Sequence, residues 1–278
     1  MPDSSAQLEA DLDLIRVSRE GAVTTLHFND PERLNAMSTA MGLAFRERIG
    51  GLIGDPDLRA VVLTGEGRAF SAGGDLDMLQ AQADAGAAAP GRAWRGIRDE
   101  MSRFYRLFLS LRDLPCPTIA AINGPAIGAG FCVALACDLR YVASDARLGL
   151  NFTRIGVHPG MGATWTLPRL VGPALAAELL YTSRLLRGEE AARIGLANRC
   201  LPREEVLGAA RATAAEIAGN APLAVRSVKQ ALARSSSVSL EDQLQFEASE
   251  QARHFESIDA REGLAAIREK RDPVFEGR

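Results

Sequence analysis

Two glycine-rich segments contain the groups in this sequence that are best suited to chemistry. Residues 65–75 read GEGRAFSAGGD after the mostly apolar run 60–64, and residues 123–130 read NGPAIGAG after the run 118–122. Each segment leads into a helical pattern, so each predicts a turn between a buried strand and a helix. Such a turn directs unpaired backbone N–H groups outward at the helix start, where the helix dipole favours negative charge. Two such turns could hold one anionic oxygen between two N–H donors.

The glycine spacing does not match the common nucleotide-binding motifs. Gly124, Gly128 and Gly130 are not arranged as GxGxxG, and neither segment ends in the Lys-Ser/Thr pair of a P-loop. We therefore expect neither a dinucleotide site nor a triphosphate site here. A single glycine-rich turn can also be only a tight connection between a strand and a helix. The two turns together, with the motifs around them, favour a functional site.

The composition is typical of a globular protein without a strongly charged surface. Of 278 residues, 47% are hydrophobic and 24% are charged, and the formal net charge is -3. The chain has no dense run of Lys or Arg, so nucleic acid is not an expected partner. The four cysteines, Cys116, Cys132, Cys137 and Cys200, show neither CxxC nor metal-finger spacing. This favours reduced thiols and no metal site.

The N-terminal segment, residues 1–13, is polar and acidic, and we expect it to be flexible. It lacks the basic start and apolar stretch of a secretory signal. No apolar run approaches the roughly 20 residues that a membrane-spanning helix needs. These features predict a cytoplasmic protein that does not contact a membrane.

Periodicity predicts an α/β core over residues 14–200 and a helical region over residues 201–278. The expected strands are a hairpin of 14–19 with 22–28, followed by 60–64, 118–122 and 138–142. The expected helices are 39–52, 76–82, 94–111, 131–136, 203–218, 222–234, 240–255 and 259–270. Residues 83–91, nearly all Ala and Gly, are expected to form a mobile loop.

Four motifs in order resemble the enoyl-CoA hydratase/isomerase, or crotonase, superfamily. They are DPERLNAM at 30–37, RAFSAGGDL at 68–76, the segment 122–131 that begins with ING, and Glu262-Gly263 with Glu269-Lys270-Arg271. The resemblance extends over residues 14–277. It implies a crotonase-like spiral of ββα turns with a C-terminal helical region that trimerises, frequently as a dimer of trimers.

The resemblance also implies an oxyanion hole formed by two backbone amides. In the family, these amides belong to the residue after the first Gly of the SAGxD motif and to the middle residue of a GGG run, which here are Gly74 and Ala129. Ala129 departs from the usual Gly, but a backbone donor tolerates the methyl group if φ stays negative. Preorganised donors stabilise an enolate-like oxygen, each by on the order of 3 kcal/mol. Coenzyme A is implied as part of the substrate, with no permanently bound cofactor.

The same resemblance implies a path for the adenine and pantetheine of coenzyme A along the first two motifs. The residues expected there are Arg33, Leu34, Ala36, Ser71, Ala72, Gly73, Asp75 and Leu76. Arg33 or Lys270 would meet phosphate oxygens, although a single surface cation is more often only solvated.

The carboxylates that family hydratases use are missing from their expected positions. Two glutamates normally share the general acid/base work, and here Cys132 and Phe152 occupy their places. Other branches of the family carry an aspartate in the turn that begins at Gly156. Here the corresponding place reads Pro159-Gly160-Met161, which contains no acid.

Few side chains remain to move a proton. His158 is the candidate acid/base because imidazole titrates near neutral pH, although it also fits a packed loop residue. Asp75 is better suited to capping a helix, and Cys132 to packing as a small hydrophobe. Phe152 and Trp165 either shape an acyl or aryl pocket or pack in the core.

Three functions stay open from the sequence. The first is an enzyme of the hydratase or isomerase type that uses a non-standard acid/base, and the second is a protein that binds acyl-CoA without turnover. The third is a thioesterase with Ser71 or Cys132 as nucleophile and His27, His158 or His254 as base. Ser71 lacks the GxSxG frame of a nucleophile elbow, which disfavours this third reading.

Overall fold

The computed structural model describes residues 12–278, so most of the predicted flexible segment 1–13 lies outside the described residues. Its main sheet has six strands in the order β1-β2-β3-β4-β6-β9. The strands are β1 Ile15–Glu20, β2 Val23–Phe28, β3 Ala60–Gly65, β4 Thr118–Ile122, β6 Leu139–Ala143 and β9 Arg199–Leu201. The hairpin β1-β2 is antiparallel, as predicted, and every later pairing is parallel. The turns that follow β3 and β4 therefore leave the same edge of the sheet.

A second sheet of three short strands lies beyond the main one. Its strands are β5 Ala126–Ile127, β7 Arg147–Gly149 and β8 Leu186–Arg187, in the order β5-β7-β8. Strand β5 lies inside the second glycine-rich turn, and it pairs in parallel with β7. The second turn is thus held by a sheet that the sequence did not predict.

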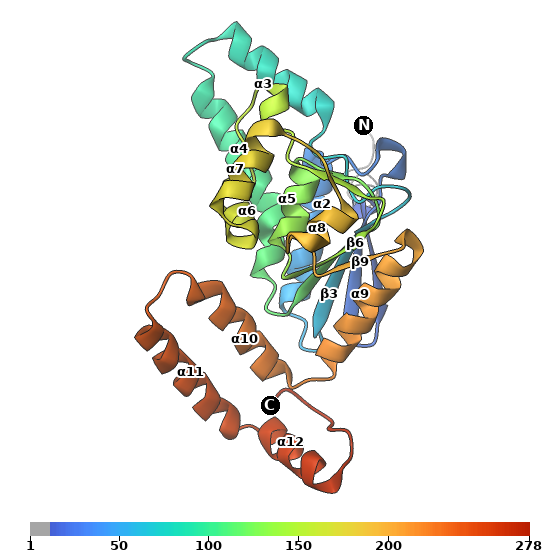
Figure 1. Cartoon of the computed structure of the whole chain (residues 1–278), viewed down its shortest axis with the longest axis vertical. Helices are drawn as coiled ribbons and strands as arrows, with labels where there is room; N and C mark the ends of the chain where they lie inside the picture. The colour runs from blue at the N-terminus through green and yellow to red at the C-terminus, as the bar shows by residue number, and fades with distance from the viewer. Residues whose placement is uncertain (1–11) are drawn as a thin grey trace, which may run out of the picture.

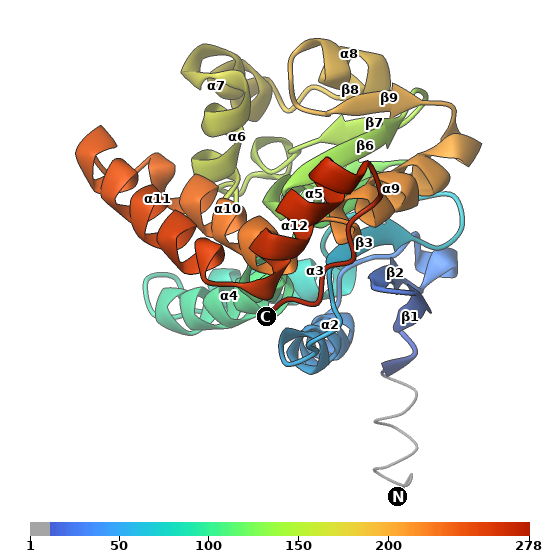
Figure 2. The same ribbon diagram turned by 90° about the horizontal axis from the view of Figure 1, so that it is seen from below.

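Helices cover the sheet, as Figures 1 and 2 show. In the core they are α2 Thr39–Ile53, α3 Leu76–Ala88, α4 Trp94–Leu109, α5 Ala129–Ala136, α6 Ala163–Val171, α7 Pro173–Thr182, α8 Gly188–Arg193 and α9 Arg203–Ala218. Short 3-10 turns are η1 Pro31–Arg33, η2 Ser110–Asp113 and η3 Thr153–Ile155. Helix α9 packs on β3, β4 and β6.

Aromatic side chains join the sheet to α2 and α4. The ring of Phe28 on β2 lies 5.7 Å from that of Phe45, 6.4 Å from that of Phe108 and 5.6 Å from that of Phe70, measured between centroids. Such spacings are favourable for aromatic pairs. Because Phe70 belongs to the first glycine-rich turn, this cluster anchors the turn to the core.

The predicted loop at 83–91 is wrong over most of its length. Helix α3 continues from Leu76 to Ala88, through the Ala-rich segment. Alanine has the highest intrinsic helix propensity, so a run of it extends a helix that has already been started by a cap.

The C-terminal helices form an arm that stands apart from the core in Figure 1. The arm consists of α10 Pro222–Ser235, α11 Leu240–Phe255 and α12 Ile258–Glu269. Lys229 ties it to the core, because its ammonium donates to Cys116 O at 2.7 Å and lies 3.0 Å from Asp138. Large apolar side chains are exposed along the arm, namely Val228, Leu232, Leu240, Leu244, Phe255, Leu264 and Ile267.

None of the helices between residues 12 and 278 combines the length and the apolar character needed to cross a membrane.

Two glycine-to-alanine changes should alter stability in opposite directions. Gly50 lies on the exposed side of α2 with no atom within 4 Å of an added β-carbon, so Gly50→Ala should raise the free energy of unfolding, by about 0.5–1 kcal/mol. A β-carbon at Gly130 would lie 2.5 Å from the buried Ser71 Oγ. Gly130→Ala should therefore lower the free energy of unfolding, by about 1–3 kcal/mol. Chemical denaturation at one protein concentration measures both, and shifts of the same sign would contradict the packing described.

Candidate active site

The two glycine-rich turns are hydrogen-bonded to each other along their backbones. The N–H groups of Phe70 and Ser71 both donate to Pro125 O at 3.1 Å, and the Ile127 N–H donates to Ser71 O at 3.0 Å. This is a short parallel bridge between Ser71 and Ala126. Segments that are more than fifty residues apart in the sequence therefore form one surface.

Glycines allow this close approach at two points. Gly73 has φ +98°, and a β-carbon there would lie 2.6 Å from Ile127 O and 3.6 Å from Ala129 N. Gly130 packs directly on the Ser71 side chain. Only a residue without a β-carbon fits either position without displacing its neighbour. Gly73 consequently lies directly against the start of α5.

The Gly74 and Ala129 amides are both left without a protein acceptor. Met37 N–H donates to Gly73 O at 2.7 Å, and Asp75 N–H donates to Met37 O at 3.1 Å, so the Gly74 N–H faces away from this pairing. Ala129 is the first residue of α5, a position whose N–H has no partner within a helix. Within residues 12–278, neither amide donates a hydrogen bond. Ala129 also keeps negative φ, the condition for tolerating its methyl group.

Two asparagines hold the first turn in place, and the sequence analysis assigned neither a role. The Asn35 amide donates to Glu66 O and to Ala69 O, each at 2.9 Å, and its oxygen accepts from the Asp30 N–H. Asn123 donates to Gly65 O at 2.8 Å and Gly67 O at 3.1 Å. Asn123 begins the second glycine-rich segment, and this was the available signal, since Asn amides commonly bond turn backbones. Asn35 lies in the earlier segment 30–37, where no local pattern indicated its contact with the first turn.

Asp75 caps α3, as the sequence favoured. Its carboxylate accepts from the Met78 N–H at 2.9 Å and pairs with the Arg33 guanidinium. Arg33 also lies 3.9 Å from Asp30, so its charge is partly compensated within the protein. The side chain is nevertheless half exposed and can still meet an anion.

The residues expected along the coenzyme A path lie next to one another. The Ala72 N–H donates to Leu34 O at 2.8 Å, and the Met37 N–H donates to Gly73 O at 2.7 Å. Ala36 lies between these two bonded residues in the chain. Leu76, at the start of α3, is 79% exposed although apolar, so it is available to a ligand. Lys270 is separate from this group, because it caps the end of α12 on the C-terminal arm.

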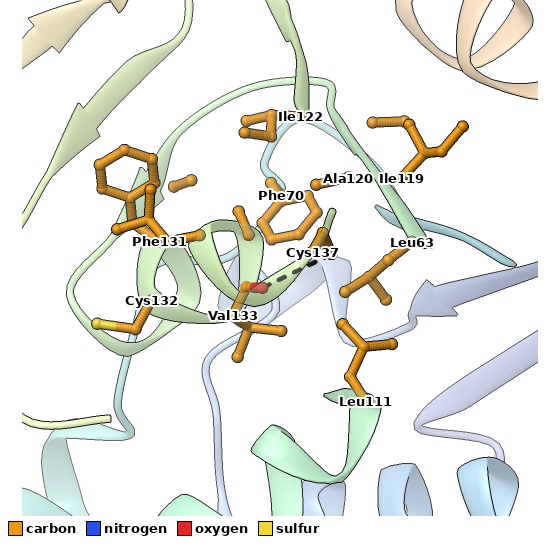
Figure 3. Close-up of a cluster of buried hydrophobic side chains, with 14 of the residues drawn as sticks. Leu63, Phe70, Leu111, Ile119, Ala120, Ile122, Phe131, Cys132, Val133 and Cys137 are labelled. Carbon is orange, nitrogen blue, oxygen red and sulfur yellow. Dashed lines mark hydrogen bonds between the residues drawn. The ribbon is translucent and has the colours of Figure 1, made fainter. Parts of the chain in front are cut away.

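Cys132 lies one helical turn after Ala129 on α5 and is buried. Figure 3 shows its sulfur on the side of α5 away from Leu63 and Leu111. The thiol contacts Gly160 O at 3.7 Å, and burial raises the pKa of Cys132 to about 12. The thiol thus stays protonated at neutral pH and is a poor nucleophile. Phe152 precedes η3 and packs against the core while partly exposed.

His158 and Trp165 lie on different surfaces. His158 is exposed, and its Nδ1 lies 2.8 Å from Pro159 O, which makes Nδ1–H the donor. No residue from 12 to 278 forms a hydrogen bond with Nε2. The Trp165 ring is contacted by two guanidinium groups, those of Arg112 at 5.1 Å and Arg169 at 4.0 Å from the ring centre. It lines a cavity of about 960 Å³ between the core and α10, and the two free amides are not in that lining.

The hydrogen bonds of Ser71 do not suit a hydrolase. Its buried hydroxyl donates to Asn35 O at 2.8 Å and accepts from the Gly73 N–H at 3.2 Å. His27 lies 2.6 Å from Glu66, and His254 lies 3.3 Å from Ser227, so both imidazoles have other partners. In the part of the chain from residue 12 onward, no group of three His, Cys, Asp or Glu side chains is arranged to hold a metal ion.

Comparisons with known proteins identify relatives over nearly the whole chain. Residues 18–278 match the family model for enoyl-CoA hydratase/isomerase. A short-chain-enoyl-CoA hydratase of Clostridium acetobutylicum is 34% identical over 94% of this chain and 97% of its own. Human mitochondrial enoyl-CoA hydratase domain-containing protein 2 is 37% identical over 92% of this chain and 86% of its own.

Solved structures give the same result for the fold. The crystal structure of an enoyl-CoA hydratase from Bacillus anthracis superimposes with a TM-score of 0.86 at 34% identity, covering 95% of this chain and 99% of that one. This confirms the fold class that the sequence motifs implied.

Proposed function

Because the chain belongs to the enoyl-CoA hydratase/isomerase family, we propose that it binds an acyl-CoA thioester and stabilises an enolate-like intermediate. The thioester oxygen would accept hydrogen bonds from the Gly74 and Ala129 amides. The observation that carries this proposal is that both N–H groups lie on turns in contact and donate to no residue in 12–278.

The physical advantage of such a pair is that it costs no reorganisation. Negative charge develops on the thioester oxygen when the α-carbon is deprotonated or when water adds to the β-carbon. Donors that are already fixed by glycine packing stabilise this charge without first rearranging. The dipole at the start of α5 acts in the same direction, since Ala129 is its first residue.

Proton transfer needs a group other than the usual glutamates, and we assign it to His158. The turn of His158 includes Gly160, whose carbonyl contacts Cys132 on α5. The ring keeps Nε2 free because Nδ1 is bonded to the backbone. Imidazole can accept and return a proton near neutral pH, which hydration or double-bond isomerisation requires.

A second candidate function is binding of acyl-CoA without turnover. The absence of carboxylates at Cys132 and Phe152 favours it, since the amide pair alone can hold a thioester. A thioesterase is disfavoured, because the Ser71 hydroxyl is hydrogen-bonded to backbone and the Cys132 thiol is protonated.

Removing the Ala129 N–H should test the oxyanion site directly. Proline is tolerated at the first position of a helix, so Ala129→Pro deletes the donor while keeping α5. With crotonyl-CoA and longer or aromatic enoyl-CoAs, loss of the conjugated thioester absorbance should slow by about 10²–10³-fold. Ala129→Gly is the matched control, because it retains the N–H and should keep the rate within a few fold. Equal rates in both variants would refute the assignment, and wild-type binding without turnover would support the binding protein.

Replacing His158 should separate rate from affinity. His158→Ala removes the proposed acid/base without touching either amide, so kcat should fall by about 10²–10⁴-fold. The Kd for a saturated acyl-CoA, measured by titration, should stay unchanged. An unchanged rate would dismiss His158 from the mechanism.

We also propose that the C-terminal arm assembles three chains, or six as a dimer of trimers. The exposed apolar side chains of α10, α11 and α12 support this, because a monomer rarely leaves so many in water. Sedimentation equilibrium should give a mass three or six times the 29.7 kDa of one chain. Replacing Leu232 and Leu240 by Asp should yield smaller species, and a monomeric wild-type protein would exclude the assembly.

A further inference from the structure

Tyr105 is a polar residue near the proposed site that neither the sequence motifs nor the proposed mechanism uses. It lies on α4 and is half buried. A β-carbon added to Gly160 would lie 2.5 Å from the Tyr105 hydroxyl oxygen, so the phenol rests on the glycine α-carbon. The tyrosine thus takes up space that any other residue at 160 would fill.

Gly160 also contacts Cys132, which follows Ala129 on α5. The Gly160 carbonyl accepts from the Cys132 thiol at 3.7 Å. Cys132 is three residues after Ala129 on α5, and residues at this spacing share a face of a helix. The Tyr105 hydroxyl is therefore next to the position where the thiol has replaced the family's first glutamate.

The hydroxyl is available to a ligand. No residue between 12 and 278 forms a hydrogen bond with it, and it is not among the buried polar atoms sealed without a partner. Burial, and to a smaller extent the nearby Cys132 sulfur, raises the pKa of Tyr105. The phenol therefore stays protonated at neutral pH and offers one donor and an acceptor.

Besides His158, whose imidazole is assigned to proton transfer, the acyl chain would find few other polar groups here. Cys132 offers only a weak thiol donor that already faces Gly160 O, and Phe152 offers none. An oxygen atom on the acyl chain would lose its hydrogen bonds to water on entering, at a cost of about 1–3 kcal/mol if left unpaired. Tyr105 is the side chain placed to replace them.

We propose that the Tyr105 hydroxyl hydrogen-bonds the β-hydroxyl group of a 3-hydroxyacyl-CoA and so positions the β-carbon. This inference rests on the proposed function, because it requires the thioester to occupy the amide pair. It makes Tyr105 a determinant of ligand specificity, selective for an oxygen substituent over a plain alkyl chain.

Calorimetric titration with butanoyl-CoA and 3-hydroxybutanoyl-CoA tests this, since the two ligands differ only in the hydroxyl. Every variant is compared in the His158→Ala background, so that the hydroxy ligand is not dehydrated during the titration. Tyr105→Phe should weaken 3-hydroxybutanoyl-CoA about 5–10-fold and leave butanoyl-CoA within about twofold. Tyr181→Phe is the matched control, because Tyr181 is 79% exposed on α7, and it should change neither Kd.

The outcomes separate this inference from the proposed function. Equal weakening of both ligands, or of neither, would overturn the role of Tyr105 while leaving the thioester site intact. Failure of the wild-type protein to bind either ligand would refute the proposed function itself, and the inference with it.

Gly160→Ala provides a second variant in case Tyr105→Phe does not fold. It keeps the phenol but displaces it, since the new methyl group would meet the hydroxyl oxygen. It should reproduce the selective loss for 3-hydroxybutanoyl-CoA, and unchanged selectivity in this variant would contradict the proposal.

Discussion

The close backbone contact between the two glycine-rich turns is the constraint on which the candidate site depends. It brings the segment after β3 against the segment after β4 through the bonds to Pro125 O and Ser71 O. Gly73 and Gly130 leave no room for a β-carbon at the contact. The parallel order of β3 and β4 makes the contact possible, because both turns then leave the same edge of the sheet.

The two candidate donors, the N–H groups of Gly74 and Ala129, belong to the main chain and do not depend on particular side chains. A backbone N–H is supplied by any residue other than proline, and Ala129 carries this donor with a negative φ. The side chains around it are less restricted. Cys132 and Phe152 carry no carboxylate, and each packs against the apolar core. The two amides and any side chain able to transfer a proton are therefore separate structural features of this site.

Contacts between distant segments fix the surroundings of the two turns and of Cys132. Asn35 fixes the first turn, Gly160 touches Cys132, and Tyr105 reaches across from α4. Trp165, although close to Gly160 in sequence, belongs to the cavity beside α10. That cavity lies between the core and the C-terminal arm, which exposes many apolar side chains. The cavity is therefore separate from the candidate active site.

The sequence by itself determined the local structure: the β1-β2 hairpin, the strand-turn-helix units, the Asp75 cap and the C-terminal helices. These follow from periodicity, glycine and capping residues, which act over a few neighbours. The predicted loop at 83–91 is wrong because small residues interrupted by Gly and Pro indicate a loop locally, whereas α3 extends to Ala88. Only the tertiary structure decided that the two turns touch, that Tyr105 meets Gly160, and that Trp165 faces elsewhere. Such contacts join residues far apart in the chain, and packing of whole elements, not any local pattern, sets them.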